Sequence, residues 1–107
     1  MNENNPGKLV FIGAGNMAEA MIRGIFKTGI YRNDDIVVTD IDPKRLEHFQ
    51  RELGITGSTD NKQAASAAKV IVLAVKPQQA AAVLNELKDH LPGNIFLISI
   101  VTCFTME

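Results

Sequence analysis

Near its N-terminus the chain reads Leu9-Val10-Phe11-Ile12-Gly13-Ala14-Gly15-Asn16-Met17-Ala18. The four apolar residues at the start of this stretch predict a strand that is buried on both faces. The G-x-G-x-x-A pattern that follows predicts a tight turn into a helix. Gly13 allows the turn, Gly15 leaves the backbone open to a pyrophosphate, and Ala18 is small enough for close packing of the helix on the strand. N–H groups without partners at the start of this helix would then face the phosphates.

Apolar runs and amphipathic stretches alternate along the rest of the chain. We expect further strands at 36–39, 70–75 and 95–100, and a short edge strand at 55–58. We expect helices at 16–28, 43–53, 61–68 and 77–90, the second one capped by Asp42 with Pro43 at its first position. This alternation predicts an α/β fold, a doubly wound parallel sheet of the Rossmann type with helices on both faces.

Each helix except the alanine-rich one at 61–68 has an apolar stripe that should face the sheet. The residues expected to point inward are Ala18, Met21, Ile22 and Ile25 in the first helix, Leu46, Phe49 and Leu53 in the second, and Ala80, Val83, Leu84, Leu87 and Leu91 in the last. Met17 is also expected to pack in the core, with contact to a cofactor as a second possibility. His48 and His90 are expected to lie in solvent.

Asp40 follows the second expected strand, about 20 residues after the glycine turn. A carboxylate at this position accepts hydrogen bonds from the hydroxyls of an adenosine ribose, so the combination predicts a dinucleotide site. Lys44 and Arg45 are placed to meet a 2′-phosphate, which Asp40 would repel. NADP and NAD therefore both remain open, with the carboxylate slightly favouring NADH. A purely structural role for Asp40, in the turn before Asp42, also stays open.

Composition excludes several classes of function. The chain has 107 residues, which suits one domain, and a net charge of −1, which argues against nucleic-acid partners. Cys103 is the only cysteine, so a multi-cysteine metal site is not expected, and Cys103 itself is expected to be a buried strand-end residue rather than a nucleophile. The polar N-terminus and the absence of a long apolar run predict a soluble, cytoplasmic protein with no membrane contact.

Several motifs resemble pyrroline-5-carboxylate reductases. The run Phe11-Ile12-Gly13-Ala14-Gly15-Asn16-Met17-Ala18 is similar to the opening of that family, in which G-x-G-N-M is characteristic, and Ala74-Val75-Lys76-Pro77-Gln78 resembles its A-V-K-P segment. Ser99-Ile100-Val101-Thr102 lies where the family has a small-residue stretch beside the nicotinamide. Asn61 lies where the family places an asparagine on the adenosine side of the cofactor. Thr102-Cys103-Phe104 departs from the family's small-residue pattern.

The glycine turn and this resemblance together imply a set of cofactor contacts. The expected residues are Ile12, Gly13, Ala14, Gly15, Asn16, Met17, Asp40, Asn61, Ala74, Val75, Lys76, Pro77, Ile100, Val101 and Thr102. For Lys76, a role in ending the strand and starting the helix is weighed equally with one beside the phosphate or ribose. No catalytic side chain and no metal site are identified.

The resemblance implies an activity for the whole protein, the NAD(P)H-dependent reduction of the C=N bond of Δ1-pyrroline-5-carboxylate to L-proline. The family's helical C-terminal domain, which dimerises and completes the substrate pocket, has no counterpart in this chain. We therefore expect a piece of a longer, homo-oligomeric enzyme, consisting of the dinucleotide-binding domain (1–107) and inactive alone. The alternatives are another reductase of the β-hydroxyacid or prephenate dehydrogenase type, or a nucleotide-sensing module without catalysis.

Overall fold

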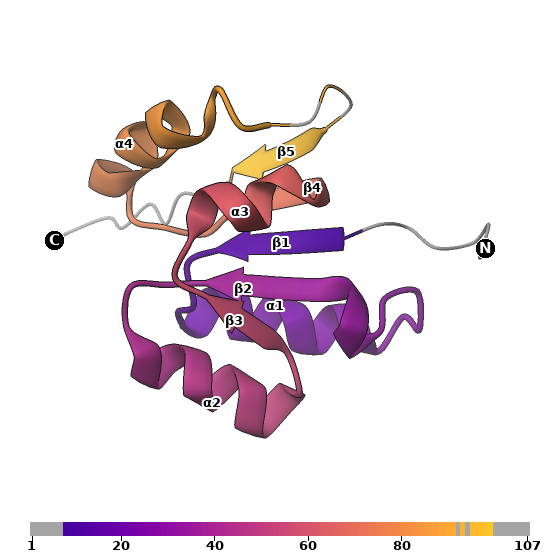
Figure 1. Ribbon diagram of the computed structural model, residues 1–107. Helices are drawn as coiled ribbons and strands as arrows, with labels where there is room; N and C mark the ends of the chain where they lie inside the picture. Colours follow the sequence, from indigo (N-terminus) through magenta and orange to yellow (C-terminus); the bar gives the residue numbers. More distant parts are fainter. Residues whose placement is uncertain (1–7, 92, 94, 100–107) are drawn as a thin grey trace, which may run out of the picture.

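Five parallel strands form one sheet in the order β3-β2-β1-β4-β5 (Figure 1). The computed structural model describes residues 8–91, 93 and 95–99. The strands are β1 (Lys8–Ile12), β2 (Ile36–Thr39), β3 (Thr56–Ser58), β4 (Ala68–Leu73) and β5 (Phe96–Ser99). The chain moves outward from β1 to β3 and then returns to the other side of β1 at β4. This reversal places a topological switch point between β1 and β4, where open α/β sheets bind ligands.

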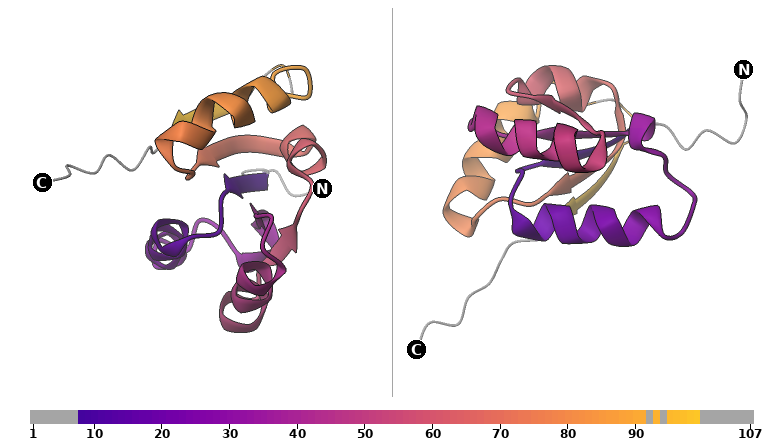
Figure 2. Two further views of the ribbon diagram at one scale, coloured as in Figure 1. Left: turned by 90° about the vertical axis from the view of Figure 1, so that its left-hand side faces the viewer. Right: turned by 90° about the horizontal axis from the view of Figure 1, so that it is seen from below.

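Four helices cover the two faces of the sheet. They are α1 (Asn16–Phe26), α2 (Pro43–Leu53), α3 (Asn61–Ser66) and α4 (Pro77–Leu87), and a 3-10 turn at Asn33–Asp35 precedes β2. Figures 1 and 2 show α1 and α3 on opposite sides of the strands. The side chains of α1 and α2 pack on one face, and those of α3 and α4 pack on the other. The expected doubly wound Rossmann-type fold is confirmed.

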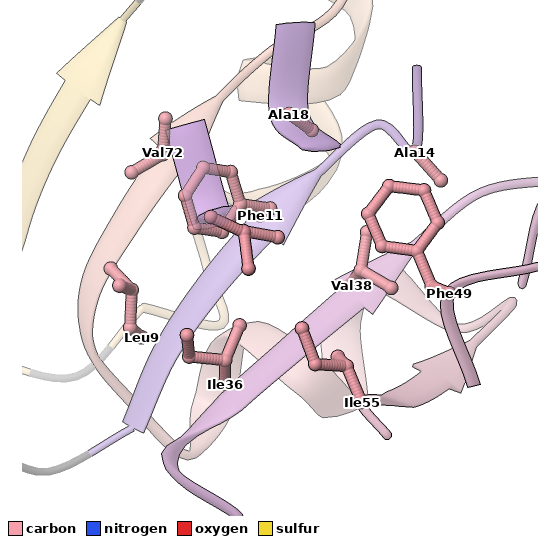
Figure 3. Packing of buried hydrophobic residues seen from close by; sticks show 10 residues of the cluster. Leu9, Phe11, Ala14, Ala18, Ile36, Val38, Phe49, Ile55 and Val72 are labelled. Atoms are coloured by element: carbon pink, nitrogen blue, oxygen red, sulfur yellow. The ribbon is translucent and has the colours of Figure 1, made fainter. Parts of the chain in front are cut away.

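The two cores share β1, whose side chains alternate between them. Leu9 and Phe11 join the cluster under α1 and α2, whereas Val10 and Ile12 join the cluster under α3 and α4. This alternation follows from the two-residue period of a strand, and all four residues are buried because both faces are covered. Figure 3 shows the first cluster, in which Phe11 and Phe49 are the largest side chains.

Helix ends agree with the local sequence. Asp42 caps α2, with its Oδ1 accepting from the backbone N–H of Lys44 at 3.0 Å, and Pro43 occupies the first turn. Gly54 ends the same helix in the left-handed conformation, at φ 68°. Asp60 caps α3 by accepting from the backbone N–H groups of Lys62 and Gln63. These contacts fix where α2 and α3 begin at the carboxyl edge of the sheet.

Strand β4 lies two residues earlier than its sequence suggests. We expected 70–75, but the strand begins at Ala68 because Ala68 pairs with Lys8 of β1. It ends at Leu73, which pairs with Ile12, because β1 turns away at Gly13 and offers no further partner. The expected extension of α3 to Ala68 is therefore wrong. Sheet pairing overrides the helix propensity of the alanines here.

Three further expectations from the helical pattern are wrong. Helix α4 ends at Leu87 rather than His90, because the chain turns and brings Leu91 back against the core. Leu84 stays 37% exposed, since α4 packs through Ala80, Val83 and Leu87 and leaves Leu84 to one side. Met17, expected in the core, is 40% exposed, because α1 buries its face through Ala18 and Ile22.

No helix in the described part of the chain is long and apolar enough to cross a membrane.

Candidate functional site at the carboxyl edge of the sheet

Gly13 makes the turn from β1 into α1. Its backbone has φ 109°, a conformation that side chains disfavour, and its N–H donates to the carbonyl of Thr39 at 2.9 Å. A Cβ at this position would lie 2.4 Å from the carbonyl oxygen of Ala74. The glycine is therefore required by the meeting of three strands, β1, β2 and β4, at this edge.

Gly15 occupies a different environment two residues later. It is the N-cap residue of α1, in an extended conformation that any residue adopts, and a Cβ built on it would meet nothing within 4 Å. No side chain caps α1, in contrast to the aspartates that cap α2 and α3. The backbone at Gly15 is thus open on the side where the positive end of the helix dipole favours an anion.

Asp40 connects the end of β2 to the glycine turn. Its Oδ2 accepts from the backbone N–H of Ala14 at 2.9 Å, and its Oδ1 accepts from the backbone N–H of Asp42 at 2.9 Å. These two bonds fix the carboxylate beside the turn. Each carboxylate oxygen has a second lone pair, so both remain able to accept from a ribose hydroxyl.

Arg45 is already engaged by the protein. Its Nε donates to the carbonyl of Ala14 at 2.7 Å, its guanidinium lies 5.5 Å from the centre of the Phe49 ring, and its Nη2 is 3.7 Å from Glu19. Arg45 was expected to be able to meet a 2′-phosphate. In the structure its Nε is already used to hold the glycine turn, so this group is not available to a phosphate. Lys44 is exposed at the start of α2.

Glu19 joins α1 to α2 through His48 and Arg45, and it also pairs with Arg23 within α1. Its carboxylate accepts from Arg23 at 2.8 Å and from His48 Nε2 at 2.9 Å, in addition to its ion pair with Arg45. The hydrogen bond from Arg23, and then that from His48, hold the pKa of Glu19 below its ordinary value of 4.5. The expectation that His48 lies free in solvent is wrong, because Glu19 draws it into this contact; His90 is exposed as expected.

A pocket of about 360 Å³ opens beside the glycine turn, on the face of the sheet that α3 and α4 cover. It combines apolar walls with amide, hydroxyl and carboxylate groups, which is typical of a small-molecule site. It is lined by Ile12, Gly13, Thr39, Asp40, Ile41, Thr59, Asn61, Val75, Gln78, Gln79, Ala82, Val83 and Glu86. Five of the residues predicted as cofactor contacts are thus brought together, namely Ile12, Gly13, Asp40, Asn61 and Val75.

The other predicted contacts lie around this pocket or outside the described residues. Ala14 is buried in the turn, and Gly15, Asn16 and Met17 are exposed beside it. Ala74 bonds to the carbonyl of Ile12, while Lys76 and Pro77 are exposed at the start of α4 and do not line the pocket. The contacts expected at Ile100, Val101 and Thr102, and the expected burial of Cys103, concern residues that lie outside the described part of the chain.

Sequence reasoning missed one whole wall of the pocket. Gln79, Ala82, Val83 and Glu86 recur at helical spacing along α4, and this period was available in the sequence. Thr39 was also missed, because no sequence signal marks it. In the structure its hydroxyl is buried and has no hydrogen-bond partner among the described residues. No group of His, Cys, Asp or Glu in the described part of the chain is arranged to hold a metal ion.

Residues 8–102 match the family model described as NADP oxidoreductase coenzyme F420-dependent. The chain belongs to this family. Within it, the chain is 39% identical over 93 residues to a pyrroline-5-carboxylate reductase of Methanosarcina acetivorans, covering 87% of this chain and 34% of that protein. The resemblance seen in the sequence is thereby confirmed. The chain spans about a third of the length of the curated family relatives it matches.

Solved structures agree. A pyrroline-5-carboxylate reductase from Coxiella burnetii superposes with a TM-score of 0.84 at 39% identity, covering 92% of this chain and 36% of that one. The pyrroline carboxylate reductase of Plasmodium falciparum, solved with NADP bound, superposes with a TM-score of 0.75 at 29% identity, covering 91% of this chain and 34% of that one.

Proposed function

We propose that this chain is the dinucleotide-binding domain of a pyrroline-5-carboxylate reductase. The observation that supports this most is the open backbone at Gly15, where a Cβ would meet nothing within 4 Å although Gly13, two residues away, is tightly enclosed. A turn with only a packing role would not need a second glycine in an extended conformation. A pyrophosphate approaching this backbone does need it.

The residues present fit a nicotinamide dinucleotide, NADP or NAD. The glycine turn and the first N–H groups of α1 would hold the pyrophosphate. Asp40, fixed by Ala14 and Asp42, would accept from the hydroxyls of the adenosine ribose. The pocket between β2 and α4 would enclose the rest of the adenosine, with the buried hydroxyl of Thr39 as a group still lacking a partner.

Asp40 and Lys44 act in opposite directions on the choice between the two cofactors. The carboxylate is beside the expected ribose and repels a 2′-phosphate, whereas the exposed Lys44 ammonium attracts one. The family description and the NADP-bound relative support NADP for this chain as well. We propose that both forms bind, and that Asp40 limits the advantage of NADPH.

The bound dinucleotide would supply the hydride that reduces the C=N bond of Δ1-pyrroline-5-carboxylate, giving L-proline. The residues of this chain would bind and orient the cofactor and keep its adenosine half away from water. Holding the imine in near-attack geometry against the nicotinamide requires a second wall. We propose that this wall belongs to the part of the enzyme that the chain does not span, and that the whole enzyme is a cytoplasmic homo-oligomer.

Two measurements on the purified chain test this proposal together. Calorimetric titration with NADPH and NADH should show saturable binding of at least one of them. In the presence of pyrroline-5-carboxylate, the absorbance of NADPH or NADH should stay constant. A second absorbance assay, with a hydroxy acid and NADP or NAD, tests the alternative of a hydroxyacid dehydrogenase. Failure of both dinucleotides to bind would refute the proposed function. Turnover on the order of 10 per second would refute the need for a second wall.

A further inference from the structure

We propose that Glu86 is a positioning residue that orients the amide of Asn61 to select adenine as the base of the dinucleotide. The inference rests on the proposed function, because it assumes that a dinucleotide binds at this edge. It concerns a contact between two consecutive helices, α3 and α4, that joins residues 25 positions apart. Both residues line the pocket beside Asp40.

The position of Asn61 is fixed by its helix. It is the first residue of α3, and the preceding Asp60 accepts from the backbone N–H groups of Lys62 and Gln63 at 3.1 Å each. Asn61 is half-buried, and α3 packs against α4. The side chain of Asn61 therefore meets the pocket from a backbone that is held on both sides.

The orientation of the Asn61 amide follows from its contact with Glu86. Asn61 Nδ2 lies 3.4 Å from Glu86 Oε1. A carboxylate only accepts hydrogen bonds, so the amide nitrogen, and not the amide oxygen, must face it. Asn61 Oδ1 is then turned away from Glu86 and becomes the group that Asn61 offers to a ligand, as an acceptor.

The rest of the pocket fits a flat base with donors on its edge. Ile41, Val75 and Val83 provide apolar surface, and Ile41 is 88% exposed, an unusual state for a large aliphatic side chain that a ring stacked on it would cover. No lysine or arginine is among the described residues that line the pocket. The acceptor that Asn61 Oδ1 presents suits the exocyclic amine of adenine and disfavours hypoxanthine, whose oxygen at the same position is an acceptor.

The test compares the dissociation constants of dinucleotides that differ only in the base. NADH and NADPH are each titrated beside the analogue in which hypoxanthine replaces adenine. The ratio of the two dissociation constants is the readout, because changes in charge or stability affect both analogues alike. The unsubstituted protein should prefer adenine by about tenfold, since an acceptor that faces another acceptor loses a hydrogen bond of typical strength.

Four single variants and one double variant separate orientation from direct contact. Glu86→Ala frees the Asn61 amide to rotate, so the ratio should fall towards one. Glu86→Gln can accept from Asn61 Nδ2 but can also donate to Asn61 Oδ1, so it should retain only part of the preference. Asn61→Ala should also bring the ratio near one, and adding Glu86→Ala to it should change the ratio no further. Asp89→Ala removes the same charge just beyond α4, outside the pocket, and should leave the ratio unchanged.

The outcomes are distinguishable from failure of the proposed function. Absence of binding by every dinucleotide would refute the proposed function and this inference with it. Binding with a ratio near one in the unsubstituted protein, or a ratio that Glu86→Ala leaves unchanged, would refute only the role of Glu86. A further loss in the double variant would show that Glu86 contacts the base directly, and would also overturn the positioning role.

Discussion

Asp40 Oδ2 accepts a hydrogen bond from the backbone N–H of Ala14 at 2.9 Å, so the residue expected to bind ribose also holds the glycine turn. On the other side of the same peptide segment, Arg45 Nε donates to the carbonyl of Ala14 at 2.7 Å. The turn is therefore fixed from both its donor and its acceptor by side chains that follow β2. This arrangement means that substitutions at Asp40 affect both the shape of the turn and the recognition of the ribose.

Replacing Asp40 by serine should shift the preference towards NADPH. The change removes an acceptor for the ribose hydroxyls and the repulsion of a 2′-phosphate, so the dissociation constant of NADH should rise about tenfold relative to that of NADPH. The ratio from calorimetric titrations is the appropriate measure, because loosening of the glycine turn weakens both cofactors. Asp42→Ser is the matched control, since serine also caps α2. An unchanged ratio in Asp40→Ser would make Asp40 a turn residue only.

The two glycines of the turn should respond to substitution in opposite ways. Gly15→Val places a branched side chain where the pyrophosphate approaches, so it should weaken dinucleotide binding at least tenfold while costing only about 1 kcal/mol at the helix N-cap. Gly13→Ala should instead destabilise the fold, because its Cβ would lie 2.4 Å from the carbonyl oxygen of Ala74. Circular dichroism during urea unfolding and calorimetric titration measure the two effects. Normal affinity in a folded Gly15→Val variant would contradict this account.

Glu19→Gln should lower stability more at neutral pH than in acid. Arg23 and His48 hold the pKa of Glu19 below its ordinary value of 4.5, so the charged form stabilises the fold. That stabilisation is complete above about 4.5 and is lost as the pH falls through the lower pKa of the folded state. We expect a loss of about 1 kcal/mol at pH 7 that is smaller at pH 3. Urea unfolding at both pH values, with the exposed Glu47→Gln as control, checks this; a pH-independent difference would contradict it.

Packing of the helices gives a further contrast between two large apolar residues. Phe49 is fully buried between α2 and the sheet, and Phe49→Ala should cost about 3–5 kcal/mol of unfolding free energy. Leu84, at 37% exposed, should tolerate replacement by alanine at a cost of about 1 kcal/mol or less. Chemical denaturation measures both. A large loss in Leu84→Ala would mean that α4 packs through the face that the sequence pattern suggested.

Features that depend on neighbouring residues were predictable from the sequence. The strand before Gly13 and the Asp42 cap both follow from local patterns that the structure bears out. The parallel sheet and its two covered faces followed from continuous apolar runs and short connections. The position of Asp40 at the edge of the site followed from its spacing after the glycine turn.

Features that depend on contacts between distant residues were not predictable in this way. The contact of Glu19 with Arg45 and His48 joins two helices, and nothing in the local sequence pairs them. The early start of β4 depends on Lys8 as a partner for Ala68. The contact of Asn61 with Glu86 joins residues of α3 and α4, and nothing in the sequence indicates that these two polar side chains meet.

The most direct test of a dinucleotide site at this edge is a titration of the isotopically labelled chain with NADPH and NADH, followed by the NMR shifts of its backbone amides. The account predicts saturable shifts at Gly13, Ala14, Gly15, Asn16 and Asp40, at the carboxyl ends of the strands, and none at Lys69 or Gly54, at the opposite edge. Absence of saturable shifts with either dinucleotide, or shifts confined to the opposite edge, would contradict it.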